Sequence, residues 1–193
     1  NPSEIEAALE DIGLPVAMKI DSRDIVHKTD AGGVCLKINS AKEARQAYED
    51  IIKSAREYNP NARIEGVLIE QRAKGGVEVI LGATRDPRVG PMCMFGLGGI
   101  FVEAMKDVTF RLAPMQEISA ENMIRSIKAY LVLQGVRGNP PADIEALKEC
   151  ILRLSQMVAN HPEINELDIN PLIVYPQGSG CVIADSRMML TRC

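Results

Sequence analysis

The chain has 193 residues, of which 46% are hydrophobic and 25% are charged, and its formal net charge is -4. This length and composition suffice for one substantial core or two small ones, so we predict a globular protein. The mild acidity provides no basic surface for nucleic acid or an anionic membrane, which excludes both as non-specific partners. Any phosphate binding must therefore be local.

Cysteine usage and hydropathy indicate the cellular compartment. The five cysteines are odd in number, widely spaced and without a Cys-x-x-Cys pair, which argues against a disulfide framework and a zinc site. No apolar run approaches the ~20 residues that span a bilayer, and no charged-then-apolar leader opens the chain. We therefore expect a cytoplasmic protein.

Helices and strands alternate in the first part of the chain. Ser3 and Glu6 have the spacing of a capping box, as do Ser40 and Glu43. The predicted elements are a helix from this first box to Gly13, a strand over 16–20, its hairpin partner over 34–38, a helix from 40 to about 59, and strands over 64–71 and 77–84.

A turn-rich cluster at residues 86–91 is the best candidate for a boundary between two lobes, 1–85 and 86–193. Beyond it the periodicity predicts a strand over 92–95, a glycine loop over 96–99, a strand over 108–112, helices over 119–133 and 142–160, and a closing hairpin of 167–174 with 182–185. This order, with hairpins rather than strict strand–helix–strand units, predicts an α+β fold with mainly antiparallel sheets.

Two oxygen-bearing side chains, Asn170 and Asp185, stand on the two segments of the closing hairpin. If those segments pair, the two side chains come to lie side by side. Magnesium binds hard oxygen ligands and typically takes one or two from the protein, with the rest from water and substrate phosphates. The pair therefore predicts a magnesium site for a nucleotide. The alternative is a solvated aspartate and a turn-capping asparagine beside an ordinary hairpin.

Three charged residues interrupt apolar strands. Lys19 would bury its stem and aim its ammonium at a phosphate, or else it is an edge lysine that reaches solvent. Glu70 and Glu78 stand eight residues apart on consecutive strands among apolar neighbours. Adenine and ribose donors would satisfy these carboxylates, whereas outward-facing carboxylates on half-solvated strands are the alternative.

The glycines at 96, 98 and 99 follow a predicted strand and would let backbone N–H groups approach phosphate oxygens. Their spacing is not that of a Walker A loop, so we reject a P-loop. Further on, Asp107 and Arg111 flank a short apolar run. Arg111 would fork onto a transferring phosphoryl group, with a surface ion pair as the alternative.

The chain has two histidines, and each of them can be explained without a chemical role. His27 lies in a polar loop before Gly32 and Gly33, and its imidazole is nucleophilic near neutral pH, so it could accept and return a phosphoryl group. An exposed loop histidine without a chemical role is the alternative. His161, at a helix end, needs no role beyond its favourable position at the negative terminus.

Five segments resemble, in order, the ATP-grasp domain of the ADP-forming acyl-CoA (acetyl-CoA) synthetases. They are more distantly similar to the nucleotide-binding part of the succinyl-CoA synthetase β subunit. The segments are residues 16–19, 24–34, 95–100, 110–114 and 166–171. The resemblance covers nearly the whole chain and implies an ATP-grasp fold of two α+β lobes.

The resemblance also implies roles for matched positions in the first lobe. Lys19 matches the lysine that contacts nucleotide phosphates, and the backbone of His27, Lys28 and Thr29 matches the loop that closes over them. His27 in addition matches a loop histidine that is implicated as a second phosphohistidine. It would relay phosphate from a histidine on the CoA-ligase part.

Further matched positions concern adenine and the metal. Glu70 and the linker from Gln71 to Ala73 correspond to the segment beside adenine, and Glu78 corresponds to the glutamate that binds the nucleotide. Asn170 and Asp185 match the magnesium ligands. The glycines Gly98 and Gly99 remain candidates for the phosphate-binding loop.

The overall reaction implied by the family is acyl-CoA + ADP + phosphate ⇌ free acid + CoA + ATP. The resemblance thus implies an acid–thiol ligase with Mg²⁺ as cofactor, ATP or ADP as substrate, and a partner CoA-binding or ligase domain or subunit that carries a phosphohistidine. Because the chain opens at the helix before Lys19 and lacks those domains, we expect an excised domain that is inactive alone. The acyl substrate, the preference between ATP and GTP, and homo-oligomer formation are left open.

A second hypothesis comes from a different class of protein. Similar domains are fused to acetyltransferase modules in protein lysine acetylating enzymes, where they sense ligands and regulate. Retention of Lys19, His27, Glu78, Asn170 and Asp185 favours a working nucleotide site instead. Another ATP-grasp ligase, such as a carboxylase or a peptide-bond-forming enzyme, fits the fold but not the loop around His27.

Overall fold

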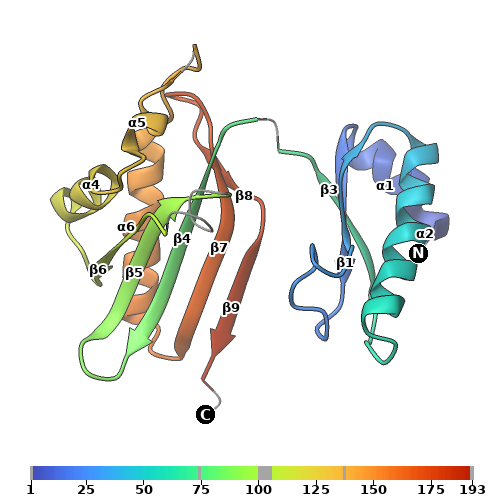
Figure 1. Cartoon of the computed structure of the whole chain (residues 1–193), viewed down its shortest axis with the longest axis horizontal. Coiled ribbons are helices and arrows are strands. Elements are labelled where there is room, and N and C mark those ends of the chain that lie inside the picture. Colours follow the sequence, from blue (N-terminus) through green and yellow to red (C-terminus); the bar gives the residue numbers. More distant parts are fainter. Residues whose placement is uncertain (1, 74, 100–105, 137, 192–193) are drawn as a thin grey trace. The chain divides into compact units, whose positions relative to one another are not determined.

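Two separate groups of buried apolar side chains organise the chain, one in unit 1 (Asn1–Arg72) and one in unit 2 (Ala73–Cys193). The computed structural model describes residues 2–73, 75–99, 106–136 and 138–191 (Figure 1). Each unit combines one antiparallel sheet with helices. The predicted α+β fold with mainly antiparallel sheets is therefore confirmed.

Unit 1 is a three-stranded sheet with two helices on one face (Figure 1). Its elements are η1 (Pro2–Glu4), α1 (Ile5–Ile12), β1 (Val16–Asp21), β2 (Val34–Ile38), α2 (Ala41–Tyr58) and β3 (Gly66–Gln71). β1 lies between β2 and β3. Alternate residues of β1, namely Val16, Met18 and Ile20, enter the core, so Ala17 and Lys19 face the opposite side of the sheet.

The two predicted capping boxes of unit 1 have different outcomes. Ser40 accepts a hydrogen bond from the Glu43 N–H at 3.2 Å and opens α2 as predicted. The prediction at Ser3 is wrong, because a short 3-10 turn precedes α1 and Glu4 occupies the N-cap. Glu6 accepts from the Arg45 guanidinium at 2.6 Å, a tertiary contact between α1 and α2.

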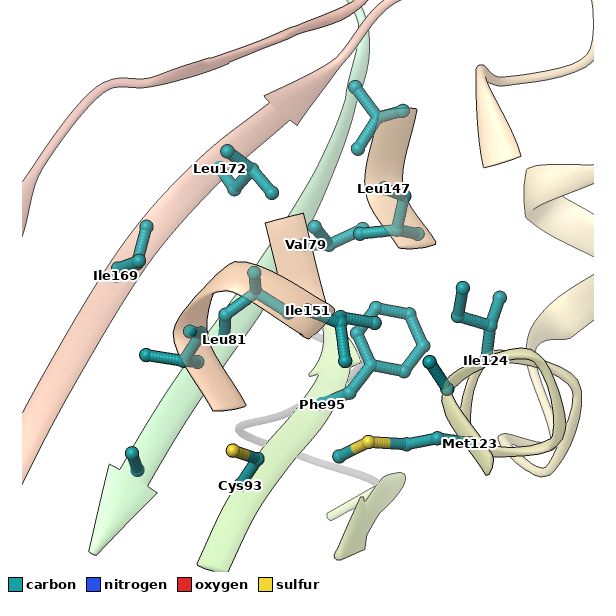
Figure 2. Packing of buried hydrophobic residues seen from close by; sticks show 14 of the residues in the cluster. Val79, Leu81, Cys93, Phe95, Met123, Ile124, Leu147, Ile151, Ile169 and Leu172 are labelled. Atoms are coloured by element: carbon teal, nitrogen blue, oxygen red, sulfur yellow. The ribbon is translucent and has the colours of Figure 1, made fainter. Parts of the chain in front are cut away.

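Unit 2 is a larger antiparallel sheet covered on one face by helices (Figure 1). Its elements are β4 (Val77–Asp86), β5 (Gly90–Leu97), β6 (Val108–Leu112), α4 (Glu117–Arg125), α5 (Tyr130–Leu133), α6 (Ile144–Asn160), β7 (Ile164–Val174), β8 (Cys181–Ile183) and β9 (Ser186–Leu190). The strand order is β6-β5-β4-β7-β8, and β9 also pairs with β7. Figure 2 shows side chains of β4, β5 and β7 packing against residues of α4 and α6, with Phe95 in the middle of this layer.

The predicted lobe boundary after residue 85 differs from the observed division between Arg72 and Ala73. β4 pairs with β5 on one side and β7 on the other, so its residues belong to the second unit. The turn cluster that suggested a boundary is the β4–β5 hairpin. There Asp86 accepts hydrogen bonds from the N–H groups of Arg88 and Val89.

The predicted helix over 119–133 is wrong, because the chain forms two helices, α4 and α5, in that region. The buried carboxylate of Asp107 accepts hydrogen bonds from the Lys128 and Ala129 N–H groups at 2.9 and 2.8 Å. These two N–H groups directly precede α5, so Asp107 binds the turn that separates the two helices.

Two further differences concern strands. Gly96 and Leu97 continue β5 rather than opening a loop, since Gly96 pairs with both Ile80 and Val108. The strand β9 had no predicted counterpart. None of the helices in the described part of the chain combines the length and apolarity that crossing a bilayer requires.

Asp143 joins α6 to the β7–β8 turn. Its carboxylate accepts hydrogen bonds from the Gly180 N–H at 2.9 Å and the Ala146 N–H at 3.1 Å. These backbone donors, Gly180 first and then Ala146, hold the pKa of Asp143 below its ordinary value of 3.8. The ionised carboxylate therefore stabilises the N-terminus of α6 and the turn together.

We expect Asp143→Asn to lower the free energy of unfolding by about 1–2 kcal/mol at neutral pH, because a single carbonyl oxygen cannot serve both donors equally. A folded-state pKa below the unfolded one means that this stabilisation is present above pH ~4 and is lost as the pH falls through the folded-state value. Urea unfolding at pH 7 and pH 3 measures the difference, which should shrink at the lower pH. Glu145→Gln, in the same helix turn, should change stability by less than about 0.5 kcal/mol. An equal effect of both substitutions would contradict the capping role.

Candidate functional site

Asn170 and Asp185 lie opposite each other on neighbouring segments of unit 2. The Asn170 N–H donates to the Asp185 carbonyl at 3.0 Å, and the Ala184 N–H donates to the Pro171 carbonyl at 3.0 Å. β7 and β8 pair as predicted, with Leu172 opposite Ile183. The predicted hairpin is confirmed, and its two oxygen-bearing residues start from adjacent backbone positions.

A β-bulge lies in β7 at Asn170 and Pro171. Val79 pairs with Leu172 and Leu81 pairs with Ile169, so the two residues Asn170 and Pro171 together oppose Ile80. Bulges of this kind re-aim side chains and are frequent beside functional sites.

Asp185 lies between the end of β8 and the start of β9. One of its carboxylate oxygens accepts a hydrogen bond from the Ser186 N–H at 3.0 Å. Asn170 is exposed and Asp185 is half-buried, so a ligand can reach both. A local backbone contact thus orients one of two accessible oxygen donors.

Glu78 and Gly98 form a second close pair in unit 2. The Gly98 N–H donates to the Glu78 carbonyl at 2.8 Å, and a Cβ at position 98 would lie 3.1 Å from both the Cβ and the carbonyl oxygen of Glu78. Only glycine permits this approach without displacement, and Gly99 has a φ of 63° in the left-handed region that favours glycine. The glycines thus place a backbone turn beside Glu78, in which Gly98 is buried and Gly99 is exposed.

Glu78 and the bulge at Asn170 lie close to each other along β4 and β7. Glu78 pairs with Ile173 and is exposed, while its neighbour Val79 points into the helix-covered core. Ile80, two residues along β4 from Glu78, opposes the bulge at Asn170. The structure therefore brings Glu78, Gly98, Asn170 and Asp185 to neighbouring positions of one sheet.

Among the described residues no group of three or more His, Cys, Asp or Glu side chains could hold a metal ion. Asn170 and Asp185 by themselves supply fewer oxygen ligands than a divalent cation binds. Magnesium fits such a pair, because it keeps waters and substrate phosphates in its coordination shell.

An acidic residue that we did not predict, Asp168, lies near this pair. Burial and then the negative charge of Glu166 raise its pKa, with Asp185 adding to the effect and Arg187 opposing it. The available signal was the spacing of Glu166 and Asp168, which alternate with the buried Leu167 and therefore share a face.

In unit 1, Lys19 forms an ion pair with Glu70, with 2.7 Å between Nζ and Oε2. β1 is the central strand of its sheet and Lys19 is only 9% exposed, so the edge-lysine alternative is wrong. Lys19 opposes Leu68 and Ala17 opposes Glu70, which makes the ion pair a diagonal contact on one sheet face. A buried ammonium requires such a partner.

The loop with His27 is a compact turn. The N–H groups of Ala31, Gly32 and Gly33 donate to the carbonyls of His27, Thr29 and Lys28 at 3.2, 3.0 and 2.7 Å, respectively. A Cβ at Gly33 would lie 2.5 Å from the Ile20 Cγ2 and 2.9 Å from the Lys28 carbonyl oxygen. The turn therefore packs directly on β1, and it presents His27 and Thr29 exposed.

The structure does not bring Arg111 to the residues near Glu78. Arg111 pairs with Cys93, which lies in the helix-covered core, so the Arg111 side chain starts from this helix-covered face. Glu78 lies on the other face of the sheet. The Arg111 guanidinium donates to the Ser126 Oγ at 3.2 Å, the Thr109 Oγ1 at 3.0 Å and the Phe110 carbonyl at 2.7 Å.

Two further predicted residues lie where the two units adjoin in sequence. Gln71 ends β3 opposite Val16 and is exposed, and Ala73 is the first residue of unit 2. The predicted segment beside adenine thus spans the division of the chain.

Comparison with known proteins places these residues in a family context. Residues 1–190 match the model of a protein family described as an ATP-grasp domain. The chain is 50% identical over 190 residues to 4-hydroxybutyrate–CoA ligase (ADP-forming) of Nitrosopumilus maritimus, in a match that covers 98% of this chain and 27% of that protein. It is also 50% identical over 182 residues to the β subunit of acetate–CoA ligase (ADP-forming) II of Pyrococcus furiosus, covering 94% of this chain and 77% of that subunit.

Solved structures extend this similarity to the fold. The acetyl-coenzyme A synthetase 1 of Ca. Korarchaeum cryptofilum, in complex with coenzyme A and Ca-AMPCP, superposes with a TM-score of 0.95 at 46% identity, over 99% of this chain and 82% of that chain. A second structure of that enzyme, with Mg-AMPPCP and a phosphohistidine segment pointing towards the nucleotide binding site, gives a TM-score of 0.83 at 42% identity, over 99% and 83% of the two chains.

We expect Gly33→Ala to lower the free energy of unfolding by about 1–3 kcal/mol, because the added methyl group collides with Ile20 and with the Lys28 carbonyl. Gly66→Ala, also in unit 1, is the matched control, since a Cβ there meets nothing within 4 Å. It should be neutral or slightly stabilising. Urea unfolding and limited trypsin digestion after Lys28 measure the two effects, and equal stability of both variants would contradict the close packing of the loop.

Proposed function

The chain belongs to the ATP-grasp domain family, and we propose that it is the nucleotide-binding portion of an ADP-forming acyl-CoA synthetase. The observation that carries this proposal is the pairing of Asn170 with Asp185 at a bulge in the sheet. Two adjacent oxygen donors suit a cation that arrives with a nucleotide, and the described residues offer no cluster of three acidic, histidine or cysteine ligands. Glu78 and Gly98, at neighbouring positions, would contact that nucleotide.

Lys19 would contribute positive charge to the phosphates. Its ammonium is held by Glu70 at 2.7 Å, so the side chain is oriented before any nucleotide binds and loses little conformational freedom on binding. A carboxylate can accept several hydrogen bonds, so Glu70 can keep Lys19 and also accept from adenine or ribose. Gln71 and Ala73 would line the same part of the nucleotide.

Phosphoryl transfer places charge on the oxygens of the moving group, and the protein mainly positions and neutralises that group. A magnesium ion, when bound, would supply Lewis-acid neutralisation of the phosphate oxygens. The residues that would hold it are Asn170 and Asp185. In unit 1 the backbone of His27, Lys28 and Thr29, and in unit 2 that of Gly98 and Gly99, would each donate N–H groups to phosphate oxygens. Arg111 is a less favoured catalytic candidate because its guanidinium is engaged on the helix-covered face.

His27 is proposed as a phosphoryl carrier. A ring nitrogen would form the N–P bond while the bond to the ADP oxygen breaks, and the phosphoryl group would then pass to a histidine of a partner domain. Exposure of His27 on a well-fixed turn supports this role, since a carrier must be accessible to both donor and acceptor.

The complete reaction that we propose is acyl-CoA + ADP + phosphate ⇌ free acid + CoA + ATP. It would require CoA-binding and ligase domains or subunits, since the chain spans 27% of the length of the 4-hydroxybutyrate–CoA ligase that it matches. The compared relatives are ADP-forming ligases, which favours this function over regulation of an acetyltransferase. Cytoplasmic location remains a prediction from the cysteine pattern.

We expect the double substitution Asn170→Ala with Asp185→Ala to abolish the magnesium dependence of ADP binding. The wild-type chain should bind ADP about tenfold more tightly with magnesium than without it, because the cation links the two oxygen donors to the phosphates. Titration calorimetry with and without magnesium measures both affinities. Glu166→Gln, an exposed carboxylate on the same strand, should keep the dependence. Metal-enhanced binding of equal size in the double variant would rule out the assigned ligands.

We expect His27→Ala, in a complete enzyme that carries this domain, to reduce ATP–ADP phosphoryl exchange by at least about 10²-fold. Affinity for ADP should change by less than about threefold, because the phosphates are held by other residues. Isotope exchange and calorimetry measure the two quantities. Normal exchange in this variant would remove His27 from the phosphoryl path while leaving the nucleotide site intact.

A further inference from the structure

Two cysteines of unit 2, Cys150 and Cys181, contact each other and have no role in the proposed nucleotide site. Cys150 lies within α6 and Cys181 opens β8, and their Sγ atoms are 3.2 Å apart. Both side chains are half-buried, so a small oxidant can reach them, whereas Cys93 is 1% exposed in the core and Cys35 belongs to unit 1. We propose that Cys150 and Cys181 form a redox-active dithiol that peroxides oxidise reversibly to an intramolecular disulfide.

The separation of the two sulfur atoms supports bond formation without rearrangement of the backbone. A disulfide has an S–S distance of about 2.05 Å, so the two atoms need to approach by roughly 1 Å from their present 3.2 Å. Small rotations of the two cysteine side chains suffice for a change of this size. The pair is thus already close to the geometry of the product.

The backbone around both cysteines is fixed by hydrogen bonds that do not involve the thiols. The Asp143 carboxylate binds the N–H groups of Ala146 in α6 and of Gly180, the residue before Cys181. The Asp143 N–H in turn donates to the Tyr175 carbonyl at the end of β7 at 2.8 Å. The two thiols are therefore held together by the fold, which raises their effective concentration for reaction with each other.

The disulfide forms in two steps. Burial, followed by the hydrogen bond with Cys150, raises the pKa of the Cys181 thiol. In the first step one of the two thiols, here assigned to Cys150, attacks the peroxide: its S–O bond forms, the O–O bond breaks and one water leaves after protonation.

Cys181 then attacks the oxidised sulfur of Cys150. The S–S bond forms, the S–O bond breaks, and the departing hydroxide takes the Cys181 proton to leave as a second water. Two thiols and one hydrogen peroxide thus give one disulfide and two waters, with two electrons transferred. Added dithiol reductant reverses the change.

The disulfide would tie the short strand β8 to α6. The two cysteines are 31 positions apart in sequence, so the crosslink would close a sizeable loop and restrict the unfolded chain. We expect the midpoint of thermal unfolding to rise by on the order of 5 °C. Amide hydrogen exchange within β8 should slow at the same time, because local opening of this strand would require the covalent link to move with it.

The experiment treats the full chain with hydrogen peroxide, alkylates the remaining thiols and maps peptides by mass spectrometry without reduction. A crosslinked peptide joining Cys150 to Cys181, lost after treatment with dithiothreitol, is the expected result. Cys35→Ser is the matched control and should keep the crosslink, whereas Cys150→Ser and Cys181→Ser should each abolish it. Circular dichroism verifies the fold of each variant, and peptide mapping of the wild-type chain does not depend on the variants.

Two results would overturn the proposal, and a third would refute one of its consequences. One is alkylation or sulfinic-acid formation at both Cys150 and Cys181 without a crosslink. Another is pairing of either residue with a different cysteine in preference to its neighbour. A crosslink that leaves both the thermal midpoint and the exchange of β8 unchanged would refute the tethering of β8.

Discussion

The pairing of β7 on both of its edges is the constraint on which unit 2 depends. This strand of 11 residues binds β4 along one edge and β8 and β9 along the other. The pairing with β4 is interrupted by a bulge near Asn170, whereas on the outer edge hydrogen bonds of Asn170 and Pro171 continue the pairing from β8 to β9. A bulge on one edge re-aims side chains while the other edge holds the strand in place.

In unit 1 the corresponding constraint is the ion pair between Lys19 and Glu70. A lysine on the central strand of a sheet is costly unless a counter-charge lies beside it, and Glu70 supplies that charge from the neighbouring strand. The pair holds an ammonium on the sheet face that α1 and α2 do not cover, close in sequence to the tight turn that presents His27. On the opposite face of the same strand, Val16, Met18 and Ile20 are buried in the core.

The β7–β8 turn links stability to both proposed sites of unit 2. Asp143 binds this turn to the start of α6, and the same frame positions the thiols of Cys150 and Cys181. β8 then leads within two residues of its end to Asp185. A covalent change at the cysteines and a ligand at Asn170 and Asp185 would therefore act on the same short strand, from its two ends.

Local sequence determined much of this protein. The capped helix at Ser40, the hairpin that opposes Asn170 and Asp185, and the apolar alternation of β1 follow from side-chain periods and turn residues that act over a few positions. The resemblance of five motifs to one family identified the ATP-grasp fold, since those motifs combine residues that few other folds combine.

Only the tertiary structure decided the remaining features. The turn between α4 and α5 is bound by Asp107, which is distant in sequence from the two N–H groups that donate to it. The side of the sheet on which Arg111 lies depends on its register with Cys93, and β4 joins unit 2 because of its partners rather than its own residues. The contact between Cys150 and Cys181 likewise requires the helix and the strand to be in place. A sequence specifies periods and turns directly, whereas register, capping at a distance and side-chain neighbours exist only after the chain has folded back on itself.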